Sequence, residues 1–228
     1  MDDRRELPRK LAHEHLARGD ATGWFEALYA EADGKEQVVP WADMQINPHF
    51  AAWLAAHPRP EAAKRALVIG CGLGDDAEAL AAVGFQVVAF DVSPTAVAWC
   101  RDRFPASTVQ YAVADLLKLP EDWIGRFELV LEIYTVQVLP VELRRQAFER
   151  MAQAVAADGT LLVIARGRDA TDEPCNMPWP LLHDELKFIE TCGLREVSFE
   201  DFLDQECPPV RRFRAEYRRP ATITSAKS

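Results

Sequence analysis

The sequence predicts an α/β protein in which helices cover both faces of a mostly parallel β-sheet. From Ala66 to Arg166, short apolar runs alternate with segments of helical periodicity, a pattern typical of parallel strands connected by helices. A glycine-rich turn, GCGLG, directly follows the first apolar run. With 228 residues, of which 49% are hydrophobic and 27% charged, the chain is expected to fold as one domain.

The N-terminal residues 1–60 are predicted to form a helical cover that belongs to this same domain. Amphipathic periodicity places helices at residues 7–17, 22–32 and 48–56. The remaining residues divide into a main domain over 61–220 and a disordered tail over 221–228.

Each apolar run of the main domain predicts a strand, and each periodic segment between two runs predicts a helix. Glycine often ends a helix in a left-handed conformation, so Gly84 and Gly159 are expected to follow helix ends. Strands are expected at 66–70, 87–91, 109–115, 127–134 and 160–166, and helices at 76–84, 95–104 and 141–159.

After Arg166 the alternation stops. A proline-rich loop is expected at 171–180, a helix at 181–192, and two strands at 195–202 and 210–219 that form an antiparallel hairpin. Arg212, Arg214, Glu216 and Arg218 share one face of the last strand. They form either a salt-bridged surface or a contact with an anionic part of a substrate.

Composition limits the possible partners. The net charge of −10 opposes binding to a phosphate backbone. The N-terminus is charged where a signal peptide would be apolar, and no apolar run reaches membrane-spanning length. The five cysteines form no C-x-x-C pair, so no metal site is expected. We expect a cytoplasmic monomer or homodimer that acts on a small molecule and contacts neither nucleic acid nor membrane.

The glycine turn predicts close approach of a ligand to the backbone at the start of a helix. Gly70, Gly72 and Gly74 are spaced more tightly than in the dinucleotide fingerprint G-x-G-x-x-G. Asp75 and Asp76 follow at the helix start, where they would repel a pyrophosphate and tolerate a cationic amine. Capping of the helix is the alternative role for these two acids.

Two further carboxylates end the next strands. Asp91 ends the second strand, where an acid can accept hydrogen bonds from both ribose hydroxyls of a nucleoside. Asp115 ends the third strand and can accept a hydrogen bond from an adenine amino group. Together with the glycine turn, these acids favour an adenosyl group linked to an amino acid.

In these motifs the chain resembles the class I S-adenosylmethionine-dependent methyltransferases over residues 66–165. The resemblance implies a Rossmann-like, seven-stranded sheet and S-adenosyl-L-methionine as cofactor. Val68 stands where many members have an acid, two residues before the first glycine. A glycine motif without this acid is similar to that of the thiopurine, thiol and halide methyltransferase-like branch. The segment VVPWADMQINPHFAAWL also resembles the N-terminal extension of that branch.

The resemblance also implies two groups of site residues. Cofactor contacts are expected from Trp41, Gly70, Cys71, Gly72, Gly74, Asp91, Val92, Ala114, Asp115, Leu116, Glu132 and Ile133. Substrate contacts are expected from Trp24, Tyr134, Arg166, Trp179 and Arg212, and Phe25 also falls in the cover.

Methyl transfer from a sulfonium requires alignment of the nucleophile and exclusion of water. A thiol, thiopurine or halide needs no general base, and no catalytic residue is assigned. An alcohol or amine acceptor would need a base, for which His49, His183 and Glu132 are candidates. The remaining alternatives are a non-catalytic protein that binds S-adenosylmethionine and a nicotinamide-dependent oxidoreductase.

Overall fold

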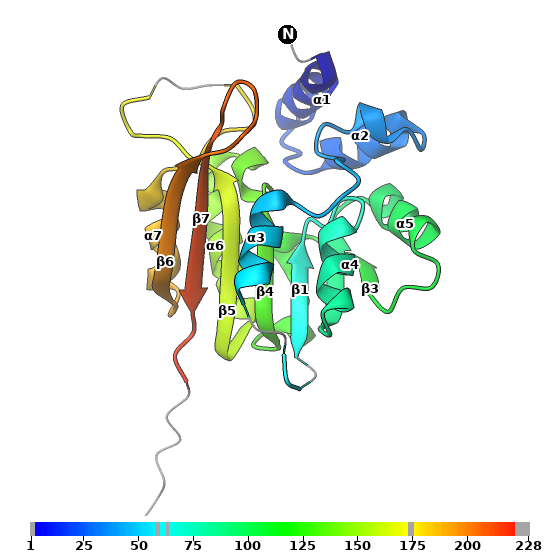
Figure 1. Cartoon of the computed structure of the whole chain (residues 1–228). Helices are drawn as coiled ribbons and strands as arrows, with labels where there is room; N and C mark the ends of the chain where they lie inside the picture. The colour runs from blue at the N-terminus through cyan, green and yellow to red at the C-terminus, as the bar shows by residue number, and fades with distance from the viewer. Residues whose placement is uncertain (1–2, 58–59, 63, 173–175, 222–228) are drawn as a thin grey trace, which may run out of the picture.

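The computed structural model describes residues 3–57, 60–62, 64–172 and 176–221. Its centre is a seven-stranded sheet in the order β3-β2-β1-β4-β5-β7-β6 (Figure 1). The first five strands are parallel, and β7 pairs antiparallel with both β5 and β6. The strands are β1 Arg65–Ile69, β2 Gln86–Asp91, β3 Gln110–Val113, β4 Phe127–Ile133, β5 Val155–Arg166, β6 Arg195–Leu203 and β7 Arg211–Arg218. The predicted parallel sheet with a C-terminal antiparallel hairpin is confirmed.

Helices cover both faces of the sheet. In Figure 1, α3 and α4 lie in front of it and α6 lies behind. Each face therefore has its own apolar core, because successive strand residues point to opposite faces. The α-helices are α1 Glu6–Leu16, α2 Gly23–Ala32, α3 Pro48–Ala56, α4 Asp75–Ala82, α5 Pro94–Arg103, α6 Val141–Ala154 and α7 His183–Thr191. Short 3-10 turns are η1 Asp3–Arg5, η2 Glu36–Val38, η3 Leu116–Lys118, η4 Glu121–Trp123 and η5 Val136–Val138.

Of the N-terminal cover, α1 and α2 lie above the carboxyl ends of the parallel strands (Figure 1), whereas α3 packs against one face of the sheet. Glu26 of α2 joins this cover to the start of α5. Its carboxylate accepts hydrogen bonds from Ser93 Oγ at 2.5 Å, from Thr95 Oγ1 at 2.6 Å and from the Thr95 backbone N–H at 3.1 Å. The cover is thus anchored one turn away from Asp91.

The predicted helix cap at Gly159 is wrong, whereas Gly84 does follow the end of α4 with φ +104°. Helix α6 ends at Ala154, and β5 begins at Val155. Gly159 lies inside β5, where an added Cβ would stand 2.9 Å from the carbonyl oxygens of Ala156 and Phe127. A register shift between β4 and β5 occurs at the same level. The glycine is needed for close backbone approach in this irregular strand start.

No helix in the described ranges is long and apolar enough to cross a membrane. The predicted tail falls on residues 221–228, of which 222–228 lie outside the described residues.

Candidate functional site

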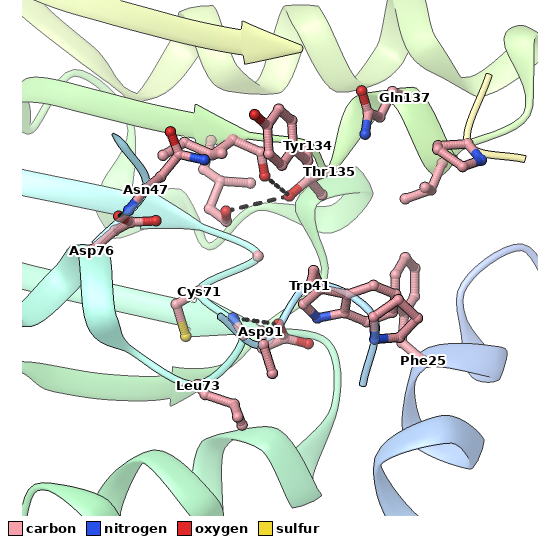
Figure 2. A pocket seen from close by; sticks show the side chains of 18 of the residues that line it. Phe25, Trp41, Asn47, Cys71, Leu73, Asp76, Asp91, Tyr134, Thr135 and Gln137 are labelled. Carbon is pink, nitrogen blue, oxygen red and sulfur yellow. Dashed lines mark hydrogen bonds between the residues drawn. The ribbon is translucent and has the colours of Figure 1, made fainter. Parts of the chain in front are cut away.

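A cavity of about 640 Å³ opens at the carboxyl edge of the parallel strands, beneath the N-terminal cover (Figure 2). This is the edge at which open α/β sheets bind ligands. Its walls come from the glycine turn after β1, from the ends of β2, β3, β4 and β5, and from the cover. The volume is in the range of small-molecule sites, about 300–1,000 Å³.

The glycine turn forms one wall, and its conformation requires glycine. Gly70, Gly72 and Gly74 have φ values of +58°, +53° and +95°, which L side chains rarely adopt. An added Cβ would stand 2.3 Å from Thr135 Oγ1 at Gly70 and 2.5 Å from the Tyr111 hydroxyl at Gly74. The turn therefore presents bare backbone to the cavity, as the predicted cofactor cradle requires.

Asp91 stands beside this turn at the end of β2. The carboxylate accepts hydrogen bonds from Gly72 N–H at 3.1 Å and from Ser93 N–H at 3.0 Å, one on each oxygen. Burial raises its pKa from 3.8 to about 6. Each oxygen retains further lone-pair capacity, so this carboxylate fits the predicted role of accepting ribose hydroxyls.

Asp115 lies at the adjacent corner of the cavity. Its Oδ1 accepts the N–H of Leu117 at 2.8 Å and thereby caps η3. Ala114 and Leu116 line the cavity on either side of it. A carboxylate flanked by apolar walls fits a flat, polar-edged ring such as adenine.

The two acids at the start of α4 have separate partners. Asp75 forms a bidentate pair with Arg103, with both N···O distances at 2.9 Å. Asp76 accepts the backbone N–H of Asn47 at 2.7 Å, and burial raises its pKa to about 6. Asn47 in turn caps α3 through its Oδ1. Asp76 therefore ties the cover to α4, whereas Asp75 ties α4 to α5, and both acids line the cavity.

Aromatic side chains of the cover form the opposite wall. Trp41 donates its indole N–H to the Tyr29 hydroxyl at 2.7 Å, and Phe25 packs edge-on against Trp41. All three line the cavity. Trp24 and Trp179, both predicted to contact substrate, are not among the lining residues. They pack in the core of the cover with Leu28 and Met177.

Tyr134 follows β4 with φ +60°, a conformation that costs about 1–3 kcal/mol and clusters at functional sites. The Arg212 guanidinium lies 4.8 Å from its ring centroid, so a cation–π contact fixes the ring. The side chains of Tyr134 and Thr135 both lie at the cavity wall (Figure 2). The structure thus brings together Tyr134, which follows β4, and Arg212 of β7, both of which were predicted to contact substrate.

Glu132 does not line the cavity, although it was predicted to contact the cofactor. Its Oε1 accepts the N–H groups of Thr135 at 2.7 Å and Val136 at 3.0 Å. Its Oε2 is buried without a described hydrogen-bond partner, and burial raises the pKa to about 7. Glu132 therefore shapes the backbone after β4, while its neighbour Ile133 lines the cavity.

The candidate histidine bases lie elsewhere. His183 stacks on Phe199 with ring centroids 3.6 Å apart, and His49 packs against Phe202. Of the described residues that line the cavity, none is a histidine. The other predicted cofactor contacts, Trp41, Gly70, Cys71, Gly72, Gly74, Asp91, Val92, Ala114, Asp115, Leu116 and Ile133, and the predicted substrate contacts Tyr134, Arg166 and Arg212 all line it.

Several lining residues were not predicted as ligand contacts, chiefly Tyr29, Asn47 and Gln137. Asn47 had a usable signal, because Asn followed by Pro48 is a strong helix start. The other two are ordinary residues of a helix or turn. Only the packing of the cover and of η5 brings them to the cavity.

Comparisons with known proteins agree with this geometry. Residues 66–159 match the methyltransferase domain family. A probable S-adenosylmethionine-dependent methyltransferase of Mycobacterium tuberculosis (strain CDC 1551 / Oshkosh) is 31% identical over 105 residues, covering 43% of this chain and 38% of that protein. The chain thus spans less than half the length of this relative.

Solved structures extend the agreement to the whole fold. One described as "Conversion of a Disulfide Bond into a Thioacetal Group during Echinomycin Biosynthesis" has a TM-score of 0.72 at 22% identity, covering 90% of this chain and 93% of that one. The 1,6-didemethyltoxoflavin-N1-methyltransferase of Burkholderia thailandensis, solved with S-adenosylhomocysteine, has a TM-score of 0.68 at 18% identity, covering 91% and 90%. The sheet order, the glycine turn and the match over 66–159 therefore agree with a methyltransferase domain in this part of the chain.

Proposed function

We propose that the protein transfers the methyl group of S-adenosylmethionine to a small-molecule nucleophile of the thiol, thiopurine or halide type. The main support for this proposal is that a single covered cavity has one part suited to the cofactor and a second part with room for a methyl acceptor. The glycine turn, Asp91 and Asp115 form a half suited to the cofactor, and Phe25, Tyr134 and Arg166 line the remainder.

When bound, S-adenosylmethionine supplies an electrophilic methyl group on a sulfonium. The residues of this chain have to hold the two reactants in line and exclude water, and alignment alone can lower a barrier by about 7–11 kcal/mol. Asp91 and the glycine turn hold the nucleoside side. Phe25 and Trp41 close the cavity from the cover, and their faces suit a sulfonium or a flat acceptor.

The choice of acceptor rests on the described lining residues, whose acids Asp76, Asp91 and Asp115 already accept backbone N–H groups and whose Glu206 already pairs with Arg212. None of the described lining residues is a histidine, and Glu132 points its carboxylate at the turn after β4. A thiolate is already nucleophilic near neutral pH, whereas an alcohol or amine would need its proton removed.

A screen for S-adenosylhomocysteine formation over thiols, halides, phenols, amines and carboxylates tests the proposal. Thiols or halides are expected to give the highest kcat/KM, with no enzyme group titrating near neutrality in kcat. Turnover of only alcohols or amines, governed by a group that titrates near neutrality, would contradict it. Calorimetric binding of S-adenosylmethionine without product from any acceptor would identify a non-catalytic binding protein instead.

A further inference from the structure

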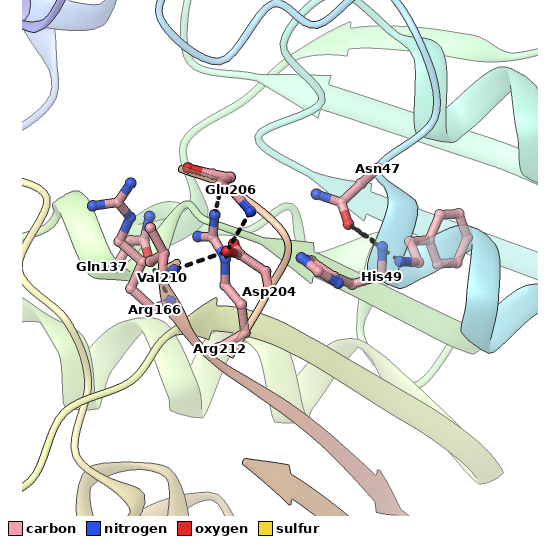
Figure 3. Close-up of polar contacts among 9 residues, drawn as sticks. Asn47, His49, Gln137, Arg166, Asp204, Glu206, Val210 and Arg212 are labelled. Atoms are coloured by element: carbon pink, nitrogen blue, oxygen red, sulfur yellow. Dashed lines mark hydrogen bonds and ion pairs between the residues drawn. The ribbon is translucent and has the colours of Figure 1, made fainter. Parts of the chain in front are cut away.

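Arg166 is the last residue of β5, and its backbone is held on both sides. Its N–H donates to Gln137 Oε1 at 2.7 Å, and its carbonyl accepts the N–H of Leu181 at 2.8 Å. The residue lines the cavity, as does Gln137 (Figure 3). These two hydrogen bonds fix the backbone of Arg166 at the part of the cavity that we assign to the methyl acceptor.

A second arginine stands directly across from it. In the antiparallel pairing of β5 with β7, Arg166 is in register with Arg212, and like charges at such positions destabilise a sheet. The Arg212 charge is balanced, because its guanidinium binds Asp204 at 2.7 Å and also pairs with Glu206. Among the described residues, no carboxylate forms an ion pair with Arg166.

The charges around Arg166 also bear on the uncompensated positive charge of its side chain. Burial lowers its pKa, and so do the charges of Arg5 and Arg212. The cavity lining as a whole holds both signs of charge: the arginines are Arg4, Arg5, Arg9, Arg166 and Arg212, and the acids are Asp43, Asp75, Asp76, Asp91, Asp115 and Glu206. The excess of positive charge is therefore local, and it lies at Arg166 and its neighbour Arg212. A bound anion would relieve the repulsion among these cations.

We infer that Arg166 binds an oxyanion of the methyl acceptor, in the first instance a carboxylate separate from the nucleophilic atom. This inference rests on the proposed function and narrows the substrate class to anionic small molecules. A guanidinium suits this role because it donates two parallel hydrogen bonds to a carboxylate.

Arg212 has a different task. Its Nε donates to Asp204 and its Nη2 donates to Glu206, and its guanidinium lies over the Tyr134 ring. Glu206 also contributes an attractive charge at Arg166, but its Oε1 is already bound to Arg212. Arg212 is therefore a positioning residue for Tyr134. Arg166 is the cation for which the described residues provide no ion pair.

The test compares two thiols of the same shape, 2-mercaptobenzoate and its neutral amide 2-mercaptobenzamide. The wild-type protein is expected to prefer the carboxylate by about tenfold or more in kcat/KM, the size of one charge-assisted contact. Arg166→Gln should raise KM for 2-mercaptobenzoate and remove the preference, with affinity for S-adenosylmethionine unchanged. Arg218→Gln is the matched control, because Arg218 has the same charge but lies at the opposite end of β7 and is exposed.

Equal kcat/KM for the two thiols, or an unchanged preference in Arg166→Gln, would overturn the inference. A second readout separates it from the proposed function. Benzoate and phenyl phosphate are titrated into the complex with S-adenosylhomocysteine, followed by NMR. If no thiol is methylated, the proposed function fails, yet binding of either oxyanion that is lost in Arg166→Gln still supports the anion site. Oxyanion binding that is absent, or equal in wild type and variant, contradicts it.

Discussion

The backbone N–H of Gly72 donates a 3.1 Å hydrogen bond to Oδ2 of Asp91, which joins the turn after β1 to the end of β2. The two elements that the cofactor would touch are thus one connected unit. Ser93, bound to the other oxygen of Asp91, also donates to Glu26 of the cover. Cofactor site and cover therefore share a chain of hydrogen bonds.

Asp91→Ala is expected to weaken binding of S-adenosylmethionine by about tenfold or more per ribose hydroxyl, since each charge-assisted bond contributes about 1.5–3 kcal/mol. The carboxylate accepts best when ionised, and its pKa is about 6. Affinity in the wild type should therefore fall as the pH decreases through 6. Isothermal titration calorimetry across pH measures both effects, and equal affinity in the variant would contradict the assignment.

Gly70→Ala is expected to abolish or sharply reduce cofactor binding. The new Cβ would stand 2.3 Å from Thr135 Oγ1, on a backbone with φ +58°. Gly125→Ala is the matched control, because Gly125 has φ +65° but no heavy atom within 4 Å of the added Cβ. Thermal unfolding and calorimetry of both variants separate backbone strain from the clash. A similar loss of binding in Gly125→Ala would contradict the clash with Thr135 as the cause.

Glu132→Gln is expected to flatten the pH dependence of the free energy of unfolding between pH 4.5 and 7. Burial raises the pKa of Glu132 from 4.5 to about 7, so the folded state holds an extra proton in this interval. Stability contributed by the protonated carboxyl is present below pH 4.5 and is lost as the pH rises toward 7.

The glutamine side chain keeps an acceptor for the N–H groups of Thr135 and Val136. Urea unfolding at several pH values, fitted as two-state, measures the slope. A slope of the same sign should persist in the variant, because Asp76 and Asp91 also have raised pKa values of about 6. An identical slope in variant and wild type would show that Glu132 does not titrate in this range.

Glu26→Ala is expected to loosen the cover, because three hydrogen bonds to Ser93 and Thr95 are lost at the start of α5. Loss of such a contact costs about 1–3 kcal/mol. Hydrogen exchange over residues 23–32 should speed up, and KM for S-adenosylmethionine should rise. Glu31→Gln, an exposed change on the same helix, is the control. Unchanged exchange in Glu26→Ala would mean that the cover is held by its apolar contacts.

Elements with a strong local signal were predictable. The run from Ala66 to Ile69 is buried throughout β1, and the positive φ values of Gly70, Gly72 and Gly74 follow from the turn that connects it to α4. The N-caps of α3 and α5 are Asn47 and Ser93, each followed by proline. These features depend on neighbouring residues only, which is why sequence spacing indicates them.

Some predicted ligand contacts were wrong because the direction of the side chain decides whether a residue lines the cavity. Glu132 and Ile133 were both assigned to the cofactor, but neighbours in a strand point to opposite faces, so only Ile133 lines the cavity. Trp24 and Phe25 are adjacent on α2, and Trp24 is buried in the core of the cover with Leu28 of the same helix and with Met177. Gly159 was assigned to a helix end because periodicity continues past Ala154, whereas sheet pairing with β4 takes over there.

The sequence by itself determined the order of strands and helices, the glycine turn, and the acids Asp91 and Asp115, because each depends on local periodicity or on the end of a strand. Only the tertiary structure decided which arginine carries an unbalanced charge. Arg166 and Arg212 are 46 positions apart along the chain (212 minus 166) and meet through the pairing of β5 with β7. The Arg212 charge is balanced by Asp204 and Glu206 from the β6–β7 loop. Electrostatic balance depends on distances between residues remote in sequence, which no spacing within the sequence encodes.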